Sequence, residues 1–143
     1  MNYEEAKKQR AAADAEGIAA QIVDAAILVH RELGPGLLES VYHTCLKYEL
    51  ESRHLSVRSE IEIPARFKDV YLECGFRADL IVGDKILVEL KAVEALLPVH
   101  KAQLITYLKL TRLDLGFLIN FNVPLLKDGL HRFVHPDLLR SAP

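Results

Sequence analysis

Apolar residues recur every three or four positions in the first third of the chain, which predicts two helices. The first helix includes the Ala-, Glu- and Lys-rich residues 1–16 and continues along an apolar series from Ile18 to Leu33. Gly34-Pro35-Gly36 should end it, because glycine tolerates left-handed backbone and the residue before a proline disfavours the helical region. The second helix follows from Leu38 and is expected to fray near residues 51–54.

From Leu55 the apolar period changes to two, which predicts strands. A half-exposed strand runs to Ile63, and Pro64 leads away from it towards a second strand over 71–82. Gly83-Asp84 then turns the chain into a third strand over 86–91. With this third strand the chain is expected to reach the middle of a sheet.

The remaining third of the chain is predicted to add one helix and two strands. Pro98 suits the first turn of a helix that runs to about Leu110. A buried strand over 115–121 and a last strand over 130–135 follow. The order ααβββαββ without repeat or linker predicts a single domain over 1–143, with 1–16 as a helical extension and a mixed central sheet of the α/β (α+β) class flanked by helices.

Composition narrows the class of protein further. Half of the 143 residues are apolar and 27% are charged, which is typical of an ordinary globular chain. No stretch approaches 18 uncharged apolar residues, and the start of the chain is too charged for a secretory signal, so we expect a cytoplasmic protein without a membrane segment. The net charge of −2 excludes a bulk nucleic-acid coat protein but permits a local phosphate site.

Candidate chemistry lies on the second and third strands, and their register decides whether it converges. A two-residue turn would place Ala78 opposite Glu89 and mix core with charge. A three-residue turn over 83–85 makes paired positions sum to 168 and leaves one face apolar, with Ala78, Leu80 and Val82 together on it. That register brings Asp79 opposite Glu89 and Arg77 opposite Lys91.

Two carboxylates so close repel unless a positive charge lies between them. Mg²⁺ prefers oxygen ligands and keeps waters for chemistry, so Asp79 and Glu89 are candidate metal ligands. Lys91 beside such an ion would hold an attacking water or a phosphate oxygen. An E-x-K triplet on a strand is more often a solvated face, and this interpretation stays open.

Further polar side chains occur on two helices. His100, Gln103 and Tyr107 form a polar stripe at helical spacing, where Gln103 and Tyr107 suit contact with a phosphate or a base and His100 is interpreted as a partly exposed histidine. Glu39 and Tyr42 share a face of the second helix; Glu39 has either a catalytic role or a favourable place at the helix N-terminus.

Several ordered motifs resemble those of the GxxExxY family, whose members are similar to small proteins with the PD-(D/E)XK nuclease fold. They are Gly36-Leu37-Leu38-Glu39-Ser40-Val41-Tyr42, Arg77-Ala78-Asp79, Val88-Glu89-Leu90-Lys91, and Gln103 to Tyr107, with the segment 119–129. The resemblance covers about 18–134 and implies a restriction-endonuclease-like core. It also implies that Asp79 and Glu89 hold Mg²⁺, that Lys91 assists the attacking water, that Gln103 and Tyr107 support DNA contact and that Glu39 joins the active site.

The resulting hypothesis is a Mg²⁺-dependent phosphodiesterase, a nuclease for which Mn²⁺ can substitute as the ion and DNA is the expected substrate. Arg77, Lys101 and Lys109 are the candidate phosphate contacts. One alternative is a module that keeps the fold and binds nucleic acid or protein without cutting. Another is a structural homo-oligomer whose carboxylates are solvated.

Overall fold

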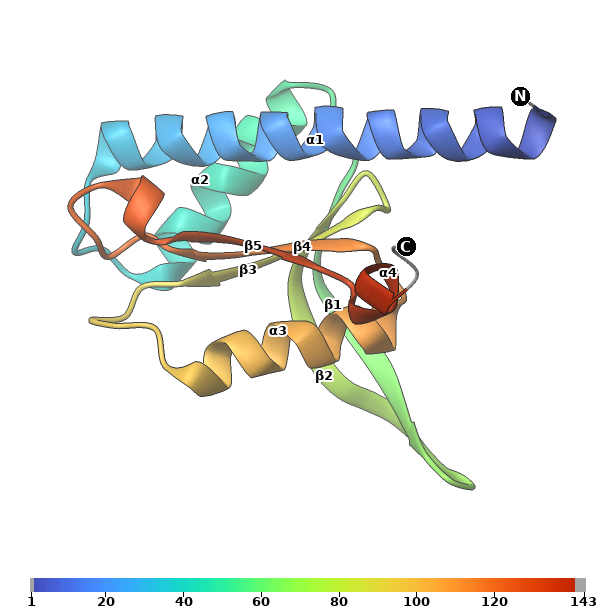
Figure 1. Cartoon of the computed structure of the whole chain (residues 1–143). Helices are drawn as coiled ribbons and strands as arrows, with labels where there is room; N and C mark the ends of the chain where they lie inside the picture. Colours follow the sequence, from blue (N-terminus) through green and yellow to red (C-terminus); the bar gives the residue numbers. More distant parts are fainter. Residues whose placement is uncertain (1, 141–143) are drawn as a thin grey trace.

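A five-stranded mixed sheet forms the centre of the computed structural model and carries helices on both faces (Figure 1). The structure describes residues 2–140, with the side chains at 8, 10–13, 139 and 140 excepted. In chain order the elements are α1 (Tyr3–Leu33), α2 (Glu39–Ser52), β1 (Val57–Phe67), β2 (Val70–Val82), β3 (Ile86–Lys91), α3 (Pro98–Thr111), β4 (Leu115–Asn120), η1 (Leu126–Asp128), β5 (Leu130–Val134) and α4 (Pro136–Arg140). The predicted order of the longer elements is confirmed; η1 and α4 are additions.

The strands lie in the order β1-β2-β3-β4-β5, and only β3 and β4 run parallel. Val82 pairs with Ile86 and Leu80 with Val88, so paired positions sum to 168 and the three-residue turn is confirmed. Both Gly83 and Asp84 have positive φ, which lets the chain reverse within this short turn.

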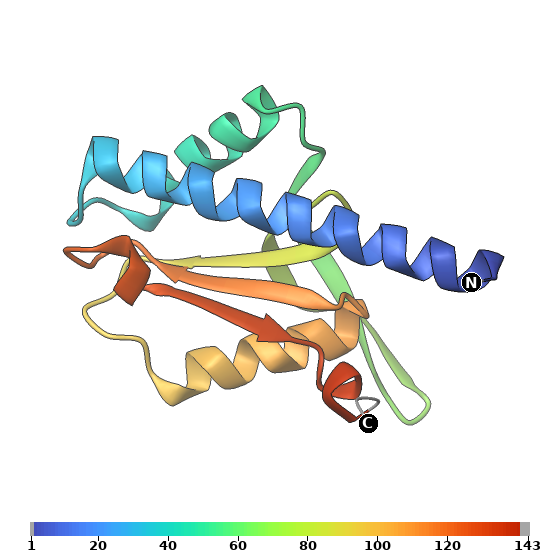
Figure 2. The same ribbon diagram turned by 45° about the horizontal axis from the view of Figure 1, so that its top comes forward.

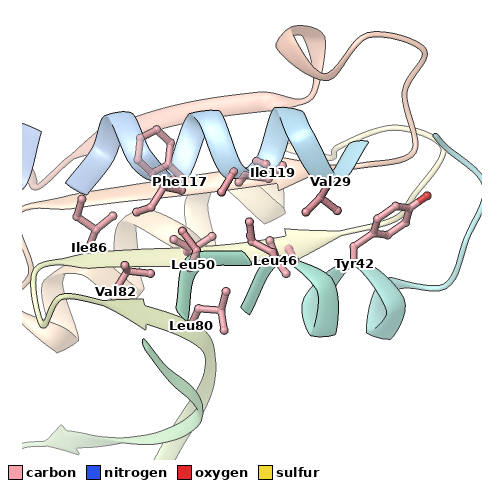
Figure 3. Close-up of a cluster of buried hydrophobic side chains, with 14 of the residues drawn as sticks. Val29, Tyr42, Leu46, Leu50, Leu80, Val82, Ile86, Phe117 and Ile119 are labelled. Atoms are coloured by element: carbon pink, nitrogen blue, oxygen red, sulfur yellow. The ribbon is translucent and has the colours of Figure 1, made fainter. Parts of the chain in front are cut away.

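Helices α1 and α2 cover one face of the sheet and α3 covers the other (Figure 2). Side chains from α1 and α2 meet inward-facing residues of the central strands in a continuous buried cluster (Figure 3). Leu104 and Leu108 of α3 pack on the opposite face with Ile81 and Leu87. Alternation along β2 and β3 therefore fills both layers, as expected for a sheet buried on two sides.

Strand β2 changes the face that its even-numbered residues present, and the change occurs at Asp79. Leu80 and Val82 belong to the cluster under α1 and α2, whereas Phe76 and Ala78 belong to the cluster under α3. Across from Asp79, Glu60 of β1 has a φ of 51°. The prediction that Ala78 shares a face with Leu80 is therefore wrong, because local backbone distortion reverses the alternation.

Pro64 does not end the first strand, contrary to the prediction. Strand β1 continues to Phe67, with a register shift between Ile63 and Ala65. Proline lacks an N–H but is tolerated at a bulge or on an edge strand, and β1 is an edge strand. The hairpin of β1 and β2 is consequently long and extends past α3 (Figure 1).

The loop between α1 and α2 is fixed by Tyr42. Its ring is buried and stacks on Phe121 with ring centroids 4.6 Å apart. Its hydroxyl donates to the carbonyl of Gly34 at 2.7 Å and accepts from the amide of Leu37 at 3.1 Å. These bonds hold the start of α2, and with it Glu39, against the end of β4.

Along 2–140 no helix combines the length and apolarity that crossing a membrane requires.

Candidate active site

Asp79 and Glu89 contact each other where the regular pairing of β2 with β3 ends. The last regular pair is Leu80 with Val88. Beyond it, the amide of Asp79 donates to Oε1 of Glu89 at 3.2 Å, and the amide of Leu90 donates to Oδ2 of Asp79 at 2.8 Å. Each carboxyl group thus accepts a backbone hydrogen bond from the strand that carries the other, and the two acidic side chains converge.

Burial makes this pair electrostatically demanding. Glu89 is only 7% exposed, which contradicts the interpretation of a solvated carboxylate face. Removal from water, followed by repulsion from Asp79, raises the pKa of Glu89 to about 9. The nearby Lys91 acts in the opposite direction. Without a cation, burial and Asp79 therefore favour the protonated form of the Glu89 carboxyl, and a bound cation would favour its ionised form.

Helix α2 brings two more side chains to Asp79. Partial burial, together with the charge of Asp79, raises the pKa of Glu39 at the first position of the helix, while Lys91 and His43 oppose this shift. Nε2 of His43 donates to the carbonyl oxygen of Asp79 at 3.2 Å. His43 was not among the predicted site residues, although its position four residues after Glu39 puts both on one helix face.

Helix α3 contributes Tyr107 but leaves Gln103 exposed. The Tyr107 ring stacks on Phe76 of β2 with centroids 3.7 Å apart. Burial, with the charges of Glu89 and Asp79, raises the pKa of its hydroxyl, so Tyr107 lies near the acidic pair. Nδ1 of His100 accepts a hydrogen bond from the amide of Leu97 at 3.0 Å and so caps the helix, and its side chain is partly exposed as predicted.

The backbone around Lys91 is held by the end of β4. Phe121 donates its amide proton to the carbonyl of Lys91 at 2.9 Å. The buried side chain of Asn120 binds both main-chain groups of Val93, accepting at 3.1 Å and donating at 2.9 Å. These contacts fix the exit of β3, where Lys91 is partly buried beside Glu89 and Glu39.

Arg77 does not lie opposite Lys91 as predicted. It pairs with Glu62 of β1, and its guanidinium lies 3.7 Å from the Glu62 carboxylate. The reason is the distortion at Asp79, which ends the regular pairing with β3 before Arg77 is reached. Arg77 is 60% exposed and lies on the long hairpin rather than beside the acidic pair.

The donors at Asp79 and Glu89 fit a hard divalent cation. Within 2–140, no three or more His, Cys, Asp or Glu side chains are grouped so as to form a complete metal site. Mg²⁺ commonly takes only one or two protein carboxylates and completes its coordination with waters and substrate phosphate oxygens. Two oxygen-bearing side chains therefore suffice for this ion, whereas a Zn²⁺ site would need three or four ligands, usually including nitrogen or sulfur.

Comparison with known protein families agrees with this geometry. Residues 16–133 match the family model of the PD-(D/E)XK nuclease superfamily. The chain belongs to this superfamily. The α+β core, with its mixed five-stranded sheet flanked by helices, is consistent with a restriction-endonuclease-like fold, so the predicted fold class is confirmed. No curated protein and no solved structure matches the chain. Membership in the narrower GxxExxY family stays a prediction.

Proposed function

We propose that this PD-(D/E)XK protein is a nuclease that hydrolyses phosphodiester bonds in DNA with Mg²⁺, for which Mn²⁺ can substitute. The observation that carries the proposal is the reciprocal contact of Asp79 and Glu89 at the end of the β2–β3 pairing. Burial there gives a pair of acids that need a positive charge to ionise together. Membership in a nuclease superfamily supports the same assignment.

In the proposed mechanism, Asp79 and Glu89 hold the ion through their carboxylate oxygens. The ion would supply charge neutralisation at the scissile phosphate and lower the pKa of an attacking water. Lys91 would hold that water or a phosphate oxygen with its ammonium group. As a carboxylate, Glu39 would accept a hydrogen bond from the water at the outer side of the site and take up its proton, because partial burial and the charge of Asp79 raise the pKa of this group and so make it a stronger base.

Substrate contacts would come from the flanking elements. Tyr107 offers a hydroxyl close to the acidic pair, and Gln103 offers an uncharged amide one turn earlier on α3. Arg77 of β2 and the exposed Lys101 and Lys109 of α3 are the candidate phosphate contacts. Tyr107 is the best placed of these side chains, since Phe76 fixes its ring.

The direct test is turnover of end-labelled single- and double-stranded DNA and RNA with Mg²⁺, Mn²⁺ or EDTA. We expect metal-dependent cleavage by the wild type and a loss of at least about a hundredfold in Asp79→Asn, Glu89→Gln and Lys91→Ala. Glu73→Gln and Lys127→Ala, at exposed positions away from the acidic pair, are the matched controls and should retain wild-type rates. Equal rates in wild type and the Asp79 and Lys91 variants would refute the proposed chemistry.

The same experiment addresses the binding-module alternative. If the wild type binds nucleic acid in a metal-dependent manner but cleaves none, it is a binding module and not a nuclease. Cleavage of RNA in place of DNA would keep the mechanism and correct the substrate.

A further inference from the structure

The outer half of the β1–β2 hairpin extends beyond α3 with both of its faces open (Figure 1). Its tip, residues 65–72, carries two large aromatic rings in solvent: Phe67 is 67% exposed and Tyr71 is 65% exposed. Val70 and Leu72 are also exposed. Such a concentration of apolar side chains at the end of a projecting ribbon is typical of a contact surface rather than of a solvated loop.

The register distributes the tip side chains over both faces of the ribbon. Phe67 pairs with Val70, and Arg66 pairs with Tyr71, so the two rings point to opposite sides. Nζ of Lys68 lies 5.4 Å from the centroid of the Phe67 ring, and Nε of Arg66 donates to the carbonyl of Lys68 at 2.9 Å. Each face therefore has an aromatic ring with a cation beside it.

Within the described residues, the two cations of the tip have no acidic partner. Neither Arg66 nor Lys68 forms an ion pair with any residue in the described part of the chain, and Asp69 is the one acid within 65–72. Two positive and one negative side chain give the tip a charge of +1, against −2 for the whole chain. Glu62, nearer the sheet, is paired with Arg77, and Glu73 is the remaining acid of this half of the hairpin.

We infer that the hairpin tip is a second contact for nucleic acid and enters a groove of the duplex whose phosphodiester lies at Asp79 and Glu89. The inference rests on the proposed function. A two-stranded ribbon fits the major groove, where side chains on both of its faces can reach the groove walls. Arg66 and Lys68 would bind phosphates, and Phe67 and Tyr71 would contact bases or sugars.

The length of β2 sets the spacing of the two contacts. Tyr71 precedes Asp79 by eight residues on the same strand, which spans about 26 Å at strand rise. About eight base pairs of duplex cover that distance at roughly 3.4 Å each. The hairpin should therefore contribute only when the duplex is long enough to reach from the acidic pair to the tip.

The test is fluorescence anisotropy of the full chain with labelled duplexes of 6 to about 24 base pairs in Ca²⁺. Wild-type affinity should rise once the duplex exceeds about eight base pairs. In Phe67→Ala/Tyr71→Ala that rise should be absent, and affinity for long duplexes should fall about tenfold or more. In Arg66→Ala/Lys68→Ala the slope of log K against log salt should shrink by about 1.8.

Controls separate the hairpin from general effects. Tyr48→Ala, which removes a ring that is 74% exposed on α2, and Lys127→Ala should leave the affinity and the salt slope unchanged. Circular-dichroism melts establish that the double variants fold, and Phe67→Trp should keep the affinity.

The possible failures are distinguishable. If both double variants keep the affinity, the length dependence and the salt slope of the wild type, the inference is wrong, even where metal-dependent cleavage is intact. Hairpin-dependent binding without cleavage would uphold it while refuting the proposed nuclease. A wild-type dimer that the Phe67→Ala/Tyr71→Ala variant abolishes in sedimentation would assign the tip to contact with a second copy and overturn it.

Discussion

The buried carboxyl of Glu89 should make the stability of the metal-free protein fall as pH rises. Its pKa in the folded state lies far above the unfolded value of 4.5, so between these values the folded chain keeps a proton that the unfolded chain has lost. Stability then decreases with pH by up to about 1.4 kcal/mol per unit. From pH 6 to pH 8 this single group should lower the free energy of unfolding by up to about 3 kcal/mol.

Glu89→Gln tests this directly, because glutamine keeps the shape and an acceptor oxygen but cannot ionise. Urea unfolding in EDTA at pH 6, 7 and 8 should show the wild type losing up to about 3 kcal/mol more than the variant across this range. Glu73→Gln, at an exposed position of the hairpin, should follow the wild type. If the free energies of wild type and Glu89→Gln fall in parallel, Glu89 is not a buried protonated acid and the electrostatic account of the site is wrong.

Three further predictions concern Glu89 and two residues that hold the backbone near the site, Tyr42 and Asn120. The apparent affinity for Mn²⁺, measured by calorimetry, should rise between pH 6 and pH 8 by up to about tenfold per unit, because the metal must displace the Glu89 proton; a pH-independent affinity would contradict this. Tyr42→Phe should lower the free energy of unfolding by about 1–3 kcal/mol, because the hydrogen bonds to Gly34 and Leu37 are lost, whereas Tyr48→Phe should leave it unchanged. Equal free energies of unfolding for the two variants would show that these hydrogen bonds do not contribute to stability. Asn120→Ala should cost about 2–4 kcal/mol in urea unfolding, since both main-chain groups of Val93 lose their partner; a loss below about 0.5 kcal/mol would refute that role.

The register that joins Asp79 to Glu89 was predictable because two independent constraints agree on it. Apolar residues of β2 and β3 match on one face only when the turn has three residues, and a slip of one position would bury charge. Val82 and Ile86 pair as this requires. The helices and strands themselves were predictable from the spacing of apolar residues and from the positions of proline and glycine, because a buried face leaves a strong hydrophobic pattern in the sequence.

The distortion beside the site was not predictable from the pattern. The alternation of β2 reverses at Asp79, across from Glu60 with its positive φ, and this reversal places Ala78 under α3. A non-glycine residue with left-handed backbone has no reliable sequence signal, because surrounding tertiary contacts hold it there. The prediction that Pro64 ends the first strand was wrong for a related reason, since a proline is tolerated within a strand at the edge of a sheet and the sequence pattern does not show which strand lies there.

Side chains brought from other elements were only partly accessible to sequence reasoning. Glu39 was predicted from its helical spacing with Tyr42 and from a family motif, whereas His43, one turn later, makes the hydrogen bond to the Asp79 carbonyl and was not predicted. Helical spacing could have suggested it, but only the packing of α2 shows that this face meets β2. Tyr107 was found as a polar position, and its stacking on Phe76 depends on the hairpin passing under α3.

The most direct test of the shared-cation claim is a crystal structure of the protein soaked with Mn²⁺, with the ion located by its anomalous scattering. One ion is expected within about 2.2 Å of a carboxylate oxygen of Asp79 and of one of Glu89, the distance of oxygen ligands to such an ion. An anomalous map with the ion elsewhere, or with both carboxyl groups hydrogen-bonded to each other and no ion at saturating Mn²⁺, would contradict it.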